Sequence, residues 1–182
     1  MYAFRVLAAV SAATLFWTVA SAQVRAADEG ALVSVSEGNI TMQAPAGWVQ
    51  REPGVRIVEA EFAVPAVEGD KDDGRCTVMG AGGTVQANID RWVGQFIETN
   101  RNKTEKKEIA GQTVHVVDLG GTYKDQRGPF APAQLRENYR VLGAIITTEK
   151  RGQYFVKFYG PQATVAANEK AFLEMLNSLK VK

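Results

Sequence analysis

Three glycines, at positions 80, 82 and 83, separate a short apolar run from an amphipathic segment. A dinucleotide fingerprint needs a further glycine where the chain has Val85, and a P-loop needs a lysine directly after Gly83, where it has Thr84. The free amides of a helix that begins here could hold an anion around Gly82, Gly83 and Thr84. A tight turn from strand to helix accounts for the glycines equally well. We expect the turn, and no cofactor.

Four carboxylates lie close together in the next candidate, a charged loop with Glu68, Asp70, Asp72 and Asp73. Carboxylate oxygens suit calcium, but an EF-hand loop would need a glycine at Arg75 and a glutamate at Ala81. A solvated loop explains the acids without a bound ion. We therefore expect no metal site.

Catalysis of the hydrolase type would depend on His115 and Cys76, the only histidine and the only cysteine. A single histidine excludes most multi-histidine metal sites and leaves one possible base for a nucleophile. Alternation places His115 on the same strand face as Val117 and Leu119, with Asp118 on the other face. Cys76 begins an apolar run and is expected to be a small buried hydrophobe. These residues favour a protein that is not an enzyme.

Aromatic side chains could line a ligand cavity, because five of them lie in two neighbouring strand candidates. Cross-strand packing is the commoner use of alternating aromatics in paired strands. We keep both interpretations for Tyr139, Tyr154, Phe155, Phe158 and Tyr159.

A basic loop is the preferred contact surface. Gly128, Pro129 and Pro132 mark residues 124–138 as a loop, and long loops on rigid sheets often carry recognition. Its candidate binding residues are Lys124, Arg127, Phe130 and Arg136.

Alternating polar and apolar residues predict the strands that must position these groups. A hairpin is expected over residues 31–45 and single strands over 55–65 and 76–81, followed by a helix capped by Thr84. Residues 100–107 are expected to connect to a short strand around Ile109. Further strands are predicted over 112–123, 139–148 and 153–159, and then a closing helix capped by Thr164. The strand 139–148 is apolar on both faces, so it must lie between two covering layers.

The first 22 residues have the order of a secretory signal: Arg5, an apolar run to Ala20, and small residues before a cleavage site after Ala22. The apolar run is shorter than the roughly 20 residues that span a bilayer, and no cysteine lies at the cleavage point for a lipid anchor. We expect cleavage, no membrane insertion afterwards, and a single domain over residues 23–182. Without Arg5, basic and acidic residues are equal in number, so no charge excess favours nucleic acid.

Several segments together resemble the Mog1/PsbP-like proteins, particularly uncharacterised secreted bacterial members. They are APAGW after the opening hairpin, the helix NIDRWVGQF and the ending YFVKFYGPQATVAANEKAFLEMLNSLK, so the resemblance covers about residues 39–181. It implies an α+β fold with a central antiparallel sheet of six or more strands flanked by helices, an α/β/α sandwich. The matching positions are structural, so the resemblance transfers no functional residue.

The resulting hypothesis is an exported, non-enzymatic binding or accessory module of the cell envelope, secreted or periplasmic, with a protein partner. Two alternatives stay open. One is a carrier with a small-ligand pocket between sheet and helix, lined by Tyr139 and Phe158. The other is a hydrolase-type enzyme that uses His115 or Cys76.

Overall fold

The computed structural model describes residues 30–126 and 132–182, so the expected signal peptide and the centre of the basic loop lie outside the described residues. A seven-stranded antiparallel sheet has the strand order β3-β4-β5-β9-β8-β7-β6. Its strands are β3 (Val49–Arg51), β4 (Ala60–Val64), β5 (Gly74–Ala81), β6 (Phe96–Ile109), β7 (Gln112–Asp125), β8 (Gln134–Thr148) and β9 (Gly152–Pro161). The expected central antiparallel sheet is confirmed.

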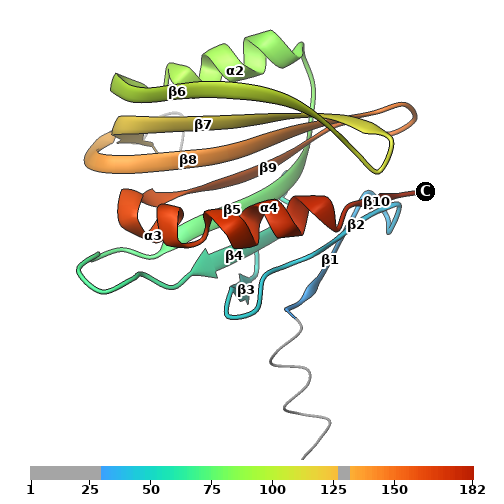
Figure 1. Cartoon of the computed structure of the whole chain (residues 1–182), viewed down its shortest axis with the longest axis horizontal. Helices are drawn as coiled ribbons and strands as arrows, with labels where there is room; N and C mark the ends of the chain where they lie inside the picture. The colour runs from blue at the N-terminus through green and yellow to red at the C-terminus, as the bar shows by residue number, and fades with distance from the viewer. Residues whose placement is uncertain (1–29, 127–131) are drawn as a thin grey trace, which may run out of the picture.

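Helices cover both faces of this sheet (Figure 1). Helix α2 (Val85–Val93) lies on one face, while α3 (Gln162–Ala167) and α4 (Glu169–Asn177) lie on the other. A small sheet of β1 (Leu32–Val35), β2 (Ile40–Gln43) and β10 (Lys180–Val181) lies on the α4 side. Within the two described ranges, no helix is long and apolar enough to cross a bilayer.

The alternation of β8 creates two hydrophobic cores, as its sequence predicts. Leu142, Ala144 and Ile146 belong to the core beneath α3, α4 and the small sheet. Val141 and Ile145 belong to the core beneath α2. Because both faces of β8 are buried, the strand lies centrally in the large sheet.

Two expectations about loops were wrong. Residues 100–107 do not connect to a short strand but belong to β6, which runs unbroken over 14 residues at the edge of the sheet. The basic loop is also shorter than expected, because β7 extends through Asp125 and β8 begins at Gln134. Backbone pairing between β6 and β7 and between β7 and β8 holds these polar residues in strands although they bury little side-chain surface.

The closing helix is also divided, and Thr164 does not cap it. Thr164 lies inside α3, and the chain breaks at Asn168 before α4 begins. The N-terminal amide groups of α3 need an acceptor, and a distant residue supplies one. The carboxylate of Asp70 accepts from the backbone N–H of Thr164 at 2.9 Å and from its hydroxyl.

Close packing of α2 on the sheet depends on a glycine. A Cβ atom at Gly143 would lie 2.3 Å from Cζ3 of Trp92. We expect Gly143→Ala to lower the free energy of unfolding by about 1–3 kcal/mol through overpacking, measured by urea denaturation. The matched control is Gly82→Ala, where a Cβ atom meets nothing within 4 Å. Equal stability of the two variants would contradict this packing.

Candidate functional site

A cleft of about 720 Å³ opens on the same sheet face as α2. Several strands of the large sheet and the loop before β5 contribute to its walls. We call it the tyrosine cleft, because three tyrosines line it. The cleft is defined by Tyr123, Tyr139, Tyr159, Arg75, Arg136 and Asp72.

A β-bulge in β8 brings one of the arginines into the tyrosine cleft. Gly121 pairs with Tyr139 and Tyr123 pairs with Arg136, so β8 has one residue more than β7 between these pairs. The irregularity includes Asn138, whose φ is +54°. Strict alternation would place positions 136 and 139 on opposite faces. Because of the bulge, Arg136 and Tyr139 share a face, and both donate to Oδ2 of Asp72 at 3.3 Å.

Two of the three arginines that line the cleft form ion pairs with nearby carboxylates. Arg75 donates to the two oxygens of Glu61 at 2.8 and 2.7 Å. These hydrogen bonds lower the pKa of Glu61. Arg136 pairs with Asp72 at 3.3 Å and, through Nε, with Asp125 at 3.6 Å. The charges of these two arginines are therefore compensated within the protein.

The lysine behind the tyrosines takes part in no such ion pair within the described ranges. Lys157 lies on the same face of β9 as Tyr159 and is only 9% exposed. Its Nζ donates to Oε1 of Gln95 at 2.6 Å and to the hydroxyl of Tyr123 at 3.2 Å. Among the described residues, no carboxylate lies within ion-pair distance of Nζ. Nζ also lies 5.3 Å from the ring centroid of Tyr123 and 5.0 Å from that of Tyr159, distances at which a ring face attracts a cation.

Burial shifts the ionisation of these groups. It lowers the pKa of Lys157 to about 7, and the charges of Arg75 and Arg91 act in the same direction. Burial raises the pKa of Tyr139 to about 12, with a further contribution from Asp72. Burial also raises the pKa of Tyr123. Near neutral pH both phenols are protonated and can donate a hydrogen bond, while Lys157 can change its charge.

The structure describes two of the four predicted contact residues of the basic loop, and these two lie on different sides of the hairpin. Arg136 lines the tyrosine cleft, but Lys124 pairs with Leu135 in the hairpin and faces the other side of it. Arg127 and Phe130 lie outside the described residues. A basic surface made of all four residues stays a prediction, and Arg136 is already paired with acids.

The glycine turn and the acidic loop both have structural roles. Thr84 caps α2 as predicted, accepting from the N–H of Ala87 at 3.1 Å, and this removes one amide that an anion could use. Anion binding at Gly82, Gly83 and Thr84 stays a prediction. In the acidic loop, Asp70 binds Thr164 and Asp73 accepts from the N–H of Ala66 at 3.0 Å. Within the part of the chain that the structure describes, no three acidic, histidine or cysteine side chains gather to hold a metal ion.

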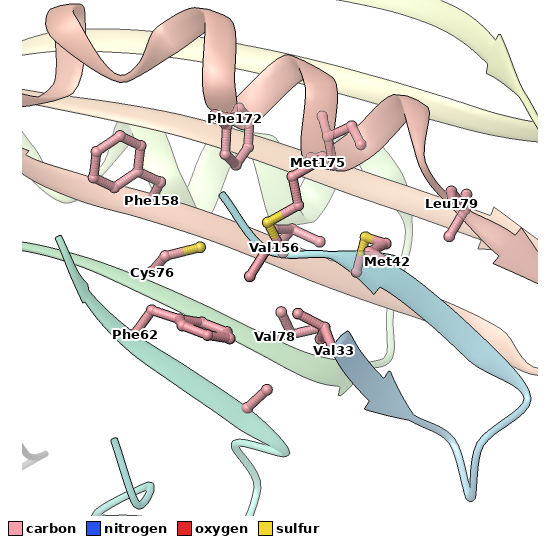
Figure 2. Packing of buried hydrophobic residues seen from close by; sticks show 14 of the residues in the cluster. Val33, Met42, Phe62, Cys76, Val78, Val156, Phe158, Phe172, Met175 and Leu179 are labelled. Carbon is pink, nitrogen blue, oxygen red and sulfur yellow. The ribbon is translucent and has the colours of Figure 1, made fainter. Parts of the chain in front are cut away.

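Cys76 and His115 lie on opposite faces of the large sheet. Cys76 is fully buried beside Phe62 and Phe158 in the core beneath α4 (Figure 2), and burial raises the pKa of its thiol. His115 alternates with core residues of that face and points to the α2 side. Burial lowers the pKa of His115, and the charge of Lys106 lowers it further. Both effects disfavour the protonated imidazole. The two side chains cannot act in one catalytic cleft.

The aromatic set is divided between the same two faces. Tyr139, Phe155 and Tyr159 pack on the α2 side, whereas Tyr154 and Phe158 pack on the α4 side. Tyr139 and Phe158 therefore cannot line a common cavity, which removes the specific pocket expected of a carrier. Tyr139 instead stacks on Tyr123, with ring centroids 6.1 Å apart and an angle of 9° between the planes.

Several cleft residues were missed from the sequence. Glu61 and Arg75 resemble ordinary surface charges of alternating strands, and only strand pairing brings them together. Lys157 could have been predicted from the sequence, because it is the single charge in the apolar segment QYFVKFYG of a central strand. Such a residue must be buried, which is costly without a partner or a function.

Comparison with known proteins identifies the fold. No protein-family model matches the chain, and no curated protein matches it either. Several solved structures, including the following three, cover most of it. Cyanobacterial PsbP (CyanoP) of Synechocystis has 11% identity and a TM-score of 0.53, covering 85% of this chain and 94% of its own. The Ran-binding protein Mog1p of Saccharomyces cerevisiae has 13% identity and a TM-score of 0.51, covering 83% of this chain and 94% of its own.

The third is LpqN of Mycobacterium tuberculosis, described as involved in cell envelope biogenesis, with 9% identity and a TM-score of 0.53 over 84% of this chain and 90% of LpqN. At these identities the likeness is one of fold. The chain has the α+β, Mog1/PsbP-like fold that its sequence resembles.

Proposed function

We propose that this chain, which has the Mog1/PsbP-like fold, is an exported binding or accessory module of the cell envelope. Residues 1–22 would direct export and be removed, and residues 23–182 would form a single domain. The module would hold a protein partner in the tyrosine cleft without bond chemistry. The observation that carries the proposal is this open cleft on a rigid sheet, backed by a buried lysine that forms no ion pair among the described residues.

Two structural neighbours are compatible with such a role. Mog1p is a Ran-binding protein, and LpqN is involved in cell envelope biogenesis. Because their likeness to this chain is confined to the fold, they support a binding role only in general terms. The choice of this particular surface is supported by the cleft alone.

The two alternatives have less support in the geometry. The enzyme alternative needs a base near a nucleophile, but His115 and Cys76 lie on opposite faces of the sheet. The carrier alternative needs an enclosed and mainly apolar pocket. The tyrosine cleft is open to solvent and presents Arg75, Arg136 and Asp72.

Site-specific crosslinking tests the proposed function. A photoreactive residue replaces Val55, which lines the cleft and is 51% exposed, or replaces Leu32 on the small sheet, which is 64% exposed. We expect one discrete protein adduct from position 55 in the exported fraction and none from position 32. Arg136→Ala should abolish the adduct, because it removes an arginine from the cleft wall.

The same material tests export. The crosslinked protein should begin at Gln23, and a chain without residues 2–22 should give no adduct because it stays inside the cell. Identical adducts from positions 55 and 32, or an adduct unaffected by Arg136→Ala, would contradict partner binding in the cleft.

A further inference from the structure

Two tyrosine hydroxyls of the cleft accept hydrogen bonds from cationic side chains. Lys157 Nζ donates to Tyr123 at 3.2 Å, and Arg75 Nη1 donates to Tyr159 at 2.9 Å. The two rings are neighbours, with centroids 5.5 Å apart. A phenol oxygen that accepts a hydrogen bond retains its own proton for donation. Each hydroxyl can therefore donate its own proton while its oxygen accepts a hydrogen bond from a basic side chain.

Neither of these protons is used within the described part of the chain. Tyr139 differs, since its hydroxyl donates to Asp72. Tyr123 is only 5% exposed, and a buried donor without an acceptor is destabilising. Both Tyr123 and Tyr159 line the cleft.

The charges around the hydroxyls favour an anionic acceptor. Glu61 is paired with Arg75, and Asp72 and Asp125 are both paired with Arg136. The remaining charges on the cleft wall, Arg51 and Asp73, form no ion pair among the described residues. Lys157 is the buried cation that forms no ion pair among the described residues, and the charges of Arg75 and Arg91 act on it more strongly than that of Asp125. A carboxylate supplies a negative charge and has two oxygens, one for each phenol donor. Hydrogen bonds to a charged acceptor are also stronger than neutral ones.

We propose that Tyr123 and Tyr159 together bind the carboxylate of an acidic side chain, Asp or Glu, that a partner protein inserts into the cleft, with Lys157 as the buried counter-charge. The cleft volume of about 720 Å³ is much larger than a carboxylate, and exposed Val55 lies on its wall. The anion must therefore be attached to a larger body. This inference rests on the proposed function and names the group that the cleft recognises.

Binding of the carboxylate should be linked to the uptake of a proton. A negative charge near Lys157 favours the protonated amine. The charged and titratable groups around the amine are Arg75 on β5, Arg91 on α2, Tyr123 and Asp125 on β7, and Tyr159 on β9. Across from Lys157, β8 contributes Gly143, which has no charge. Affinity should therefore fall as the pH rises through about 7, where free Lys157 loses its proton.

The test uses tyrosine-ring NMR signals of the purified protein and three probes: a blocked Gly-Glu-Gly peptide, its Gly-Gln-Gly analogue and inorganic phosphate. We expect the glutamate peptide to shift the signals of Tyr123 and Tyr159 and to bind at least about tenfold more tightly than the glutamine peptide. Tyr123→Phe and Tyr159→Phe should each weaken it by about tenfold. Tyr154→Phe, on the opposite face, is the matched control and should bind normally.

Lys157→Met adds a result that a purely structural role would not give, namely loss of the pH dependence of binding. Three results would overturn the carboxylate assignment: equal affinity for the two peptides, equal signal shifts with phosphate, or unchanged peptide affinity in both tyrosine variants. If crosslinking from position 55 still captures one partner, the proposed function survives that failure. If the crosslinks fail while the glutamate peptide binds, the anion site stands and the partner-binding role falls.

Discussion

Replacing Asp118 by alanine should lower the free energy of unfolding by about 3 kcal/mol, because it removes one partner of a buried ion pair. Asp118 accepts from Arg140 Nε at 2.8 Å and from its Nη2 at 3.0 Å. The side chain of Arg140 is only 3% exposed, so water cannot replace these bonds. Glu169 still contacts Arg140 at 2.8 Å, which keeps the expected loss at the lower end of the range for buried pairs.

Urea denaturation measures this loss, with Glu105→Ala as the matched control. Glu105 pairs with Lys107 at 3.2 Å, but its side chain is 65% exposed, so that variant should change stability by less than about 1 kcal/mol. Replacing Asp118 and Arg140 together by apolar residues should restore much of the stability, since no buried charge then lacks a partner. Equal losses for the single and double variants would contradict this account.

The same network predicts how stability depends on acidity. Burial raises the pKa of Asp118, but hydrogen bonds from Arg140 and Arg101 lower it more, so the net shift is downward from 3.8. A carboxyl whose pKa is lower in the folded state stabilises the fold above its unfolded pKa. The difference between wild type and Asp118→Ala should therefore be complete above about pH 4 and shrink as the pH falls further.

Replacing Lys157 by methionine should have the opposite effect and raise the free energy of unfolding by about 2–4 kcal/mol at neutral pH. Burial lowers the pKa of Lys157 from 10.5 to about 7, and each unit corresponds to about 1.4 kcal/mol against the charged form. Methionine fills a similar volume without a charge. The gain is reduced by loss of the hydrogen bonds to Gln95 and Tyr123.

The pH dependence identifies the cause of this gain. Between pH 7 and 10.5 the unfolded chain keeps a proton that folded Lys157 has lost, so wild-type stability should rise with pH across that interval. Below pH 7 both states keep the proton, so the free-energy cost of burying the charged amine is complete and constant. The advantage of Lys157→Met should therefore be largest below pH 7 and diminish toward 10.5. Lys170→Met is the control, because Lys170 is 89% exposed and its pair contributes little.

A less stable Lys157→Met variant at neutral pH would mean that the amine contributes more to the fold than it costs. The expected combination is a more stable protein that binds its acidic partner less well. Such an exchange of stability for function is characteristic of binding sites, and it would explain why a charge lies in the middle of an apolar strand.

Part of this protein was determined by local sequence. Thr84 predicted the start of α2 correctly, and the apolar residues on both faces of β8 placed it in the centre of the sheet. The sequence also excluded nucleotide-binding motifs in the glycine turn. These features depend on neighbouring residues in the chain, whose periodicity reports which side chains are buried. The fold itself was implied by the resemblance of the longer segments to the Mog1/PsbP-like proteins.

The tertiary structure decided the rest. Most of β6 was missed, and only its end around Ile109 was predicted, because an edge strand that buries few side chains has no alternation to detect. The tyrosine cleft needs the bulge at Asn138, which moves Arg136 to the face of Tyr139 without changing any residue type. Asp70 reaches Thr164 across 94 positions of the chain. Contacts between distant segments and a register shift of one residue leave no periodic signal, so only the folded chain could show them.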